Sequence, residues 1–443
     1  MPLDRREFLL SLTAVGVAQA GPARADWRVG LASVDITPAP GVWMGGYAAR
    51  TQPAQGALQP LHAKALALED AGGAVAVMVT LDLLGLTAPM VATIAADVER
   101  RHGLPRRSLI LSSSHTHSGP VVDDQLAVAY ELTADQWQRV TASTRRIEGQ
   151  VVDVVGQALA SRAPARLRTA QGQTTFAANR RTQFTPNGPT DHAVPVLCVE
   201  RPDGTLVGLL FGYACHNTTL QAESVQFHGD YAGVAQAELE RRHAGVTAMY
   251  MAGCGADSNP RPRGTLALVE QHGRALADAV DAVVSGATPV TGTLRAAFGD
   301  ASLPYAPAPD ASAWKTRLAD EDVYVRRHAK LMLDVLAREG RLPASEAAPV
   351  HVLRLGSLTL VTLSGEVVVD YALAIKREYG ERVWVAGYCD TVFGYVPSLR
   401  VLREGGYEGG GAMLYYGRPG PFAEPVEATL LAEVRAQMRA TAS

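Results

Sequence analysis

Apolar residues fall along this chain in short runs that alternate with longer segments of helical period. Short runs rich in Val, Leu and Ala and bounded by Gly, Pro or Asp predict strands, whereas apolar positions three or four residues apart predict helices. Strands are predicted at residues 29–36, 63–68, 74–81, 108–113, 193–200, 206–214, 247–252, 350–355, 358–363 and 383–386, with another after 292. Helices are predicted at residues 88–102, 137–159, 233–243, 266–284 and 367–379, up to 339, and from 426 onward. This mixture predicts an α/β or mixed α+β fold, with central β-sheets flanked by helices.

The pattern gives no internal repeat and no clear linker, so we expect a single large domain over residues 26–443. Residues 300–349 are charged and rich in Pro and Ala. They predict either a helical insertion that covers a cleft or a simple surface excursion.

Composition excludes some classes of protein. Apolar residues make up 47% and charged residues 19% of the 443 residues, which is ordinary for a globular protein. The net charge is −3 and no basic run occurs, so we expect no nucleic-acid partner. The four cysteines are widely spaced and form no CxxC pair. They predict buried thiols, with one disulfide left open and not assignable.

The first 25 residues predict an export signal. Arg5 and Arg6 precede an apolar run that reaches Ala20, and a small-x-small site follows at residues 23–25. The paired arginines resemble a twin-arginine signal, and a Sec signal that carries two arginines is the alternative. The run is shorter than the ~20 residues that span a bilayer, and no later stretch reaches that length unbroken. We therefore expect an exported, periplasmic or secreted protein without a transmembrane segment, which starts near Asp26.

The strongest chemical signal is a pair of histidines at the end of a predicted strand. Residues 112–120 read Ser-Ser-Ser-His-Thr-His-Ser-Gly-Pro, which places His115 and His117 two positions apart. In an extended segment such side chains point to the same face, and imidazole is a common zinc ligand. A pair of hydrogen-bonded structural histidines explains the pattern equally well.

Two further segments carry candidate residues after predicted strands. His216 follows the strand at 206–214. A single histidine there is a strong candidate metal ligand only if the fold places it beside His115 and His117. Residues 252–260 form a glycine-rich turn that contains Ser258, and this turn either exposes a hydroxyl to a substrate or simply needs glycine for its geometry. His228 and Asp230 precede a helix and are best explained by a turn.

Glu366 stands between the strand at 358–363 and the helix at 367–379. Helix capping is a sufficient reason for a carboxylate there. As a ligand, Glu366 would complete a set of two histidines and one glutamate that leaves a position for water, which is the pattern of catalytic zinc sites.

These blocks together resemble the catalytic domain of the neutral ceramidases, over residues 29–417. The His-Thr-His-Ser-Gly-Pro block, the later strand-end histidine, the glycine turn, Gly-Glu before a helix and a tyrosine-rich tail occur in the family's order. The resemblance implies Zn²⁺ held by His115, His216, Glu366 and Tyr395. It also implies that His117, Arg180, Ser258 and Tyr407 face the substrate. Tyr407 stands twelve residues after Tyr395, as the family's second tyrosine does.

The sequence departs from the family in three places. The turn at 255–260 reads Gly-Ala-Asp-Ser-Asn-Pro where the family has Gly-Asp-x-Ser-Pro-Asn, which leaves the role of Ser258 open. Pro397 and Ser398 replace the Thr-Thr that follows the ligand tyrosine. The family's C-terminal immunoglobulin-like domain is not expected, because the chain ends soon after the catalytic motifs.

The resemblance implies a zinc-dependent amidohydrolase that cleaves ceramide or a related N-acyl lipid. Residues 26–443 would form its ceramidase-like catalytic domain. The same site acting on another amide or an ester is one alternative, and a non-catalytic exported lipid-binding protein is another. A lipid substrate allows transient contact with a membrane surface, and the oligomeric state stays open.

Overall fold

A bent nine-stranded sheet forms most of the β framework. The computed structural model of the protein describes residues 26–442. The strand order is β11-β9-β8-β6-β1-β3-β4-β5, with β13 beside β6. The strands are β1 (Trp27–Asp35), β3 (His62–Asp70), β4 (Val75–Leu81), β5 (Leu109–Ser113), β6 (Ala163–Gln173), β8 (Ala193–Glu200), β9 (Leu206–Tyr213), β11 (Thr247–Ala252) and β13 (Thr288–Pro289). The two halves meet where Trp27–Val29 of β1 pairs with Ala163–Ala165 of β6, a narrow joint of three residues on each strand.

A four-stranded sheet closes the framework. Its order is β14 (Leu294–Pro304), β15 (Ser345–Leu355), β16 (Leu358–Leu363) and β18 (Trp384–Ala386). One central core contains side chains from both halves of the larger sheet and from this smaller one, such as Leu66, Met249 and Leu360. Three pairs of very short strands lie outside the sheets: β2 (Gly56–Ala57) with β10 (Gln226–Phe227), β7 (Ala177–Asn179) with β12 (Ser258–Pro260), and β17 (Glu366–Val367) with β19 (Tyr395–Val396).

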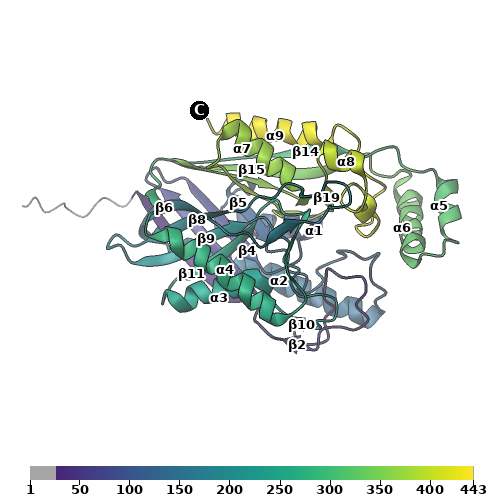
Figure 1. The fold of residues 1–443 in the computed structure, drawn as a ribbon, viewed down its shortest axis with the longest axis horizontal. Coiled ribbons are helices and arrows are strands. Elements are labelled where there is room, and N and C mark those ends of the chain that lie inside the picture. The colour runs from purple at the N-terminus through teal and green to yellow at the C-terminus, as the bar shows by residue number, and fades with distance from the viewer. Residues whose placement is uncertain (1–25, 443) are drawn as a thin grey trace, which may run out of the picture.

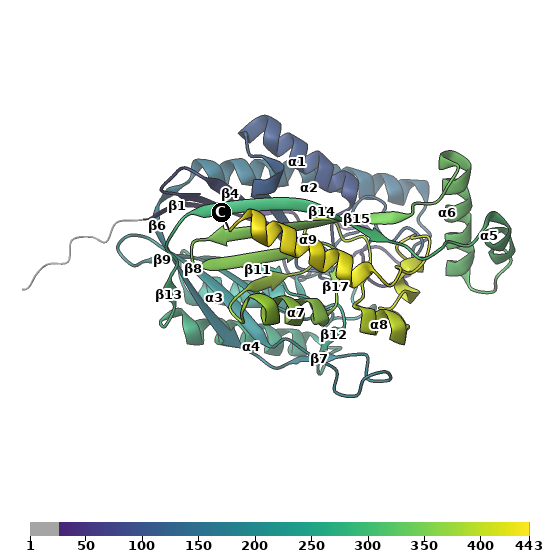
Figure 2. The ribbon, with the colours of Figure 1, turned by 90° about the horizontal axis from the view of Figure 1, so that it is seen from above.

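Helices cover the outside of this β core. Figure 2 shows α1 (Ala88–His102) and α2 (Ala134–Ala160) on one side, and α3 (Asp230–Arg242) and α4 (Leu266–Val284) on the opposite side. The helices α7 (Val369–Tyr379) and α9 (Val426–Ala440) cover the four-stranded sheet. Strand β3 illustrates the sorting, because Ala63 and Ala65 pack with the α1–α2 layer while Leu66 and Leu68 point into the central core. The predicted fold class is therefore confirmed.

Residues 311–339 form a helical hairpin that stands out from the body. Helix α5 (Ala311–Arg317) and helix α6 (Val323–Glu339) project at one end of the molecule (Figure 1). Trp314, Ala329 and Met332 form a small hydrophobic cluster of their own between the two helices. The short helices α8 (Leu399–Glu404), η1 (Arg106–Ser108) and η2 (Gly411–Leu414) complete the fold.

Local sequence signals located most of these elements. Helices α1 and α4 and strands β8, β11 and β16 have the predicted bounds. In α1 the Thr87 side chain accepts a hydrogen bond from the Met90 amide, and Gly103 ends the helix at φ 68°. Strand β6 was not predicted, because much of it is exposed and its apolar pattern is weak. The four cysteines are buried free thiols, and no helix among residues 26–442 has the length and apolar character to cross a membrane.

Candidate active site

Loops that follow three distant strands meet at one end of the β core. His115 and His117 follow β5, and His216 follows β9. A parallel bridge between Thr116 and Asn217 ties these two loops together. Such a bridge fixes the spacing of the flanking side chains, so histidines about a hundred positions apart in the sequence are placed on the same side.

The candidate ligands Glu366 and Tyr395 are joined in the same way. They are direct partners in the parallel pair of β17 and β19. Helix α7 begins only at Val369, and Val368 is its N-cap. The interpretation of Glu366 as a helix cap is therefore wrong, since its carboxylate lies outside the first turn and points to the histidines.

The backbone at His115 differs from the extended segment that the His-x-His pattern predicted. Strand β5 ends at Ser113, and His115 has a φ of 61°, in the left-handed region that non-glycine residues rarely occupy. The two imidazoles nevertheless converge, with their Nε2 atoms 3.1 Å apart. A strained residue of this kind persists only where its surroundings impose it, at a cost of about 1–3 kcal/mol.

Four donor atoms gather around one point. The Glu366 Oε2 atom lies 3.1 Å from Nε2 of His115 and 3.1 Å from Nε2 of His216. The Tyr395 hydroxyl lies 3.1 Å from Nε2 of His216. Zinc bonds of ~2.0–2.1 Å in a tetrahedral site place neighbouring donors about 3.3 Å apart, so these spacings suit the metal.

The tautomers of His115 and His216 direct no N–H at this point, and the Tyr395 hydroxyl is the group there that carries a proton. Nδ1 of His115 faces the Leu84 carbonyl at 2.6 Å, and Nδ1 of His216 faces the Gly255 carbonyl at 2.9 Å. A carbonyl oxygen only accepts, so both Nδ1 atoms carry the hydrogen and both Nε2 atoms present lone pairs. Glu366 Oε2 consequently has no hydrogen-bond partner although it is buried. Imidazole lone pairs and a carboxylate that face one another are the donor set of catalytic zinc sites, so these residues fit a zinc ion.

Burial keeps the imidazoles of His216 and His117 neutral. Burial, with Arg180 nearby, lowers the pKa of His216 to about 4, and burial also lowers the pKa of His117 well below its usual value. Neutral imidazoles beside an ionised carboxylate are the forms that bind zinc.

A network around Arg180 supports the tyrosine. The Arg180 guanidinium donates to the Glu408 carboxylate at 2.6 Å, to the Tyr395 hydroxyl at 2.9 Å and to the Asn259 side chain at 3.2 Å. The Tyr407 ring lies 5.2 Å from the Tyr395 ring and beneath the guanidinium, and Tyr407 is 46% exposed. The structure thus brings Arg180 and Tyr407 to the site that the sequence predicted for them.

Ser258 lies behind the site. Its carbonyl accepts the amide of His216 at 3.0 Å, and its hydroxyl is fully buried with no hydrogen bond among the described residues. Within that part of the chain it is not among the residues that line the cavity at the site. Its backbone also pairs with Asn179 in the β7–β12 pair and donates to the Gly255 carbonyl at 3.0 Å.

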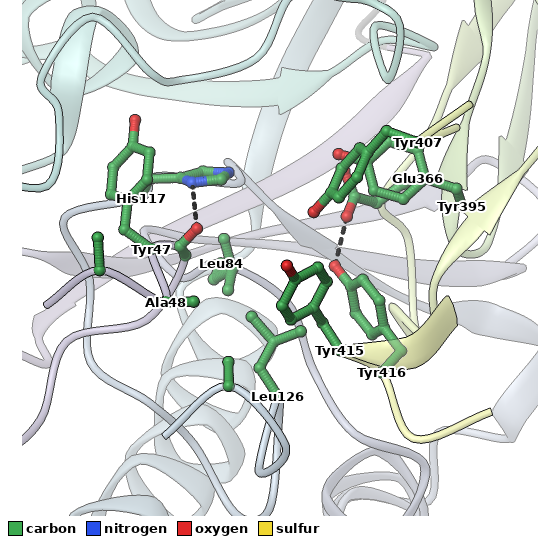
Figure 3. Close-up of a pocket in the computed structure, with 13 residues that line it drawn as sticks. Tyr47, Ala48, Leu84, His117, Leu126, Glu366, Tyr395, Tyr407, Tyr415 and Tyr416 are labelled. Carbon is green, nitrogen blue, oxygen red and sulfur yellow. Dashed lines mark hydrogen bonds between the residues drawn. The ribbon is translucent and has the colours of Figure 1, made fainter. Parts of the chain in front are cut away.

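Two of the four donor residues, Glu366 and Tyr395, line a cavity of about 250 Å³. Figure 3 shows His117 and Tyr47 on one side of this active-site cavity, with Glu366, Tyr395 and Tyr407 across from them. Apolar and aromatic side chains make up much of the remaining wall: Leu84, Leu126, Ala129, Tyr415 and Tyr416.

A loop that sequence reasoning missed holds His117. The Gly46 carbonyl accepts from Nδ1 of His117 at 3.1 Å, and Arg50 donates to the His117 carbonyl at 2.8 Å and to the Gly45 carbonyl. A Cβ on Gly46 would lie 2.5 Å from that same Nδ1 atom. The Gly-Gly-Tyr run at 45–47 was the only signal for this loop, and it reads as an ordinary turn.

Tyr416 was missed as well. Its hydroxyl donates to Oε1 of Glu366, and this leaves Oε2 directed at the histidines. The sequence showed only a tyrosine-rich tail, which does not say which ring reaches the carboxylate. His228 accepts the Asp230 amide at 2.9 Å and serves a turn, as predicted.

Comparison with known proteins agrees with this geometry. Residues 27–302 match the family described as neutral/alkaline non-lysosomal ceramidase, N-terminal, and the chain belongs to that family. No curated relative matches the sequence.

Two solved structures share the fold. The crystal structure of neutral ceramidase from Pseudomonas aeruginosa superposes with a TM-score of 0.74 at 18% identity, covering 94% of this chain and 75% of that one. A ceramidase complexed with C2 gives a TM-score of 0.72 at 18% identity, with 93% and 76% covered.

Proposed function

We propose that this protein is a zinc-dependent hydrolase that cleaves the amide bond of ceramide or a related N-acyl lipid. Membership of the ceramidase family supports an amide substrate. The observation that carries the proposal is the convergence of His115, His216 and Glu366 on one point, with the Tyr395 hydroxyl beside it. These four residues would hold the metal.

Bound zinc supplies Lewis-acid chemistry, which lowers the pKa of water and polarises a carbonyl oxygen. The protein contributes the rest of the reaction. His117 lines the cavity and keeps a lone pair on Nε2, so it takes a proton from the attacking water and returns it to the leaving amine. The Tyr407 hydroxyl reaches the cavity and donates to the oxygen on which charge develops, and Arg180 fixes the orientation of Tyr395.

Metal content of the purified protein tests this proposal, alongside the His216→Ala variant and release of fatty acid from N-acyl lipids. We expect stoichiometric zinc and hydrolysis in the wild type, and loss of both in the variant. A folded, metal-supplied wild type that holds no zinc would contradict the mechanism.

One observation favours a second candidate function. The active-site cavity of about 250 Å³ lies below the ~300–1,000 Å³ of most ligand sites, so a compact amide or an ester is the alternative substrate. Parallel assays with short amides, esters and N-acyl lipids separate the two candidates by kcat/KM.

We also propose that residues 1–25 direct export and that residues 26–443 form the catalytic domain. The signal lies outside the described residues. Strand β1 begins at Trp27, so cleavage before Asp26 would leave every described element intact. N-terminal sequencing of the exported protein would test the cleavage position.

A further inference from the structure

A second cavity lies beside the active-site cavity. Its volume is about 360 Å³, which exceeds the 250 Å³ of the first. Leu126, Tyr415 and Tyr416 line both cavities and form a common wall. Figure 3 shows these three side chains together on one side of the active-site cavity. The two cavities therefore adjoin, with the side chains of these three residues between them.

The lining of the second cavity is mixed, with buried apolar side chains, the buried polar residues Gln125 and Thr391, and charged side chains. Leu86, Val128, Val392 and Phe393 line it and are buried, with at most 4% of their surface exposed. The charged lining residues Asp124 and Arg338 are exposed, and Arg418 lies 3.4 Å from the Glu346 carboxylate in an ion pair. The buried apolar side chains give this cavity a surface against which an aliphatic chain can pack, and the Gln125 amide adds one buried polar group to it.

Helix α6 forms the outer wall of this second cavity through Leu331 and Val335. The helix is fixed against the rest of the site at several points. The Tyr324 hydroxyl donates to the Ala48 carbonyl at 3.3 Å, and His328 Nε2 donates to the Arg418 carbonyl at 2.7 Å. A Cβ on Gly417 would lie 2.6 Å from Leu331, which shows how closely helix and loop approach. The position of α6 thus sets the width of the cavity.

We propose that the second cavity is a subsite for an unbranched alkyl chain of the substrate, and that Val335 on α6 limits the chain length accepted. The inference rests on the proposed function and specifies its substrate. The first cavity has room for the scissile amide and a short segment, so a longer chain needs the second. The acyl side and the amine side of an N-acyl lipid can both supply such a chain.

The Val335→Trp variant tests the subsite, and Ala337→Trp is its matched control. Ala337 lies on the same helix, is exposed and is not among the described residues that line the cavity. Two substrate series are compared: N-acyl amides from acetyl to palmitoyl on one short amine, and N-acetyl amides on alkylamines of rising length. The series in which Val335→Trp changes the dependence of kcat/KM on chain length identifies the side of the substrate that occupies the cavity.

Burial of each methylene changes binding about fourfold, so a side chain that excludes three or four of them costs about 100-fold. We expect the long-chain to acetyl ratio of kcat/KM to fall by about that factor in Val335→Trp and to stay at the wild-type value in Ala337→Trp. Equal ratios in the two variants, or no dependence on chain length in either series, would overturn the proposal.

A binding measurement separates this inference from the proposed function. Calorimetry with the zinc-loaded protein measures affinity for saturated carboxylates from butanoate to hexadecanoate and for the matching alkylamines. The smaller Val335→Phe change serves if the tryptophan variant does not fold. Chain-dependent binding that weakens in the Val335 variant, without cleavage of any amide, would retain the subsite and refute the hydrolase. If the protein cleaves amides but the Val335 variant binds the chains as the wild type does, the hydrolase is retained and the subsite is refuted.

Discussion

Two hydrogen bonds orient His117, the residue to which we assign proton transfer. The carbonyl of Gly46 accepts from its Nδ1 atom, and Arg50 holds its backbone carbonyl. Gly46 itself has a φ of 96°, which side chains other than hydrogen rarely allow. The histidine and this glycine therefore form one unit, although some seventy positions separate them.

The Gly46→Ala variant should lower kcat/KM about 100-fold, because the new Cβ would lie 2.5 Å from Nδ1 of His117 and displace the ring. Zinc content should not change, since His117 is not one of the four proposed ligands. Gly73→Ala is the matched control: it has a φ of 84° and no heavy atom within 4 Å of its Cβ position. A comparable loss of activity in both variants would indicate backbone strain alone.

Tyr416 acts on the opposite side of the site. Its hydroxyl holds one oxygen of Glu366, and a group that orients a ligand in this way typically contributes about 10–100-fold to metal affinity. We expect Tyr416→Phe to weaken zinc binding by that factor in a chelator competition. Tyr415→Phe removes a hydroxyl from the adjacent residue and should leave the affinity at the wild-type value. Equal affinities in the two variants would mean that Tyr416 does not orient Glu366.

At the scale of elements, short bridges rather than long strands build the site. The Thr116–Asn217 bridge joins the loops after β5 and β9, and the β17–β19 pair places Glu366 beside Tyr395. The bridge pairs one residue from each loop, and the β17–β19 pair contains two residues from each strand. The turn before α3 also holds the first of these loops, because the Thr116 hydroxyl donates to the His228 carbonyl at 2.7 Å and the His228 amide donates to the Ser118 carbonyl at 3.0 Å.

The turn before α3 should make stability depend on pH. Burial lowers the pKa of His228 to about 4, and Nδ1 must stay unprotonated to accept the Asp230 amide. The unfolded chain has the ordinary value of ~6.5, so above that pH the group makes no pH-dependent contribution to stability. As the pH falls from ~6.5 to ~4, the unfolded state binds the proton first, and the wild type loses up to about 3 kcal/mol.

The His228→Asn variant tests this assignment, because an asparagine oxygen can accept the same amide without titrating. Unfolding free energies from denaturant curves at pH 7 and pH 4.5 should fall less in the variant than in the wild type. Between pH 7 and pH 8 the two proteins should change equally. Identical losses on acidification would assign the acid sensitivity to other groups.

At the scale of the molecule, the candidate ligands come from all three walls of the β core. His115 follows one half of the large sheet, His216 follows the other half, and Glu366 lies beside the four-stranded sheet. A metal at this point adds a link between walls that packing, the narrow β1–β6 joint and isolated backbone bridges such as Ser112–Cys389 and Gly253–Ala386 also hold together. Zinc should therefore affect global stability as well as activity.

We expect zinc at about 100 times its Kd to raise the unfolding free energy by about 2.7 kcal/mol, because the ligand set exists only in the folded chain. Thermal unfolding with and without a chelator would measure this change. His216→Ala should abolish the response and His228→Asn should keep it. A response of equal size in His216→Ala would place the stabilising metal elsewhere.

The sequence by itself determined the elements and most of the candidate chemistry. Thr87 and Gly103 mark the ends of α1, and the strand-end histidines His115 and His216 stand where the pattern placed them. Such signals are local, since hydrophobic period and capping act over a few residues, and the family resemblance added the remaining candidates.

Only the tertiary structure decided how these residues meet. The left-handed backbone of His115, the pairing of Glu366 with Tyr395 and the reach of Tyr416 each depend on contacts between distant segments. Strand β6 escaped prediction for the same reason, because its pairing with β1 and β8 outweighs a weak local pattern. Long-range pairing is fixed by how the whole chain buries its apolar surface, and no short stretch of sequence records that outcome.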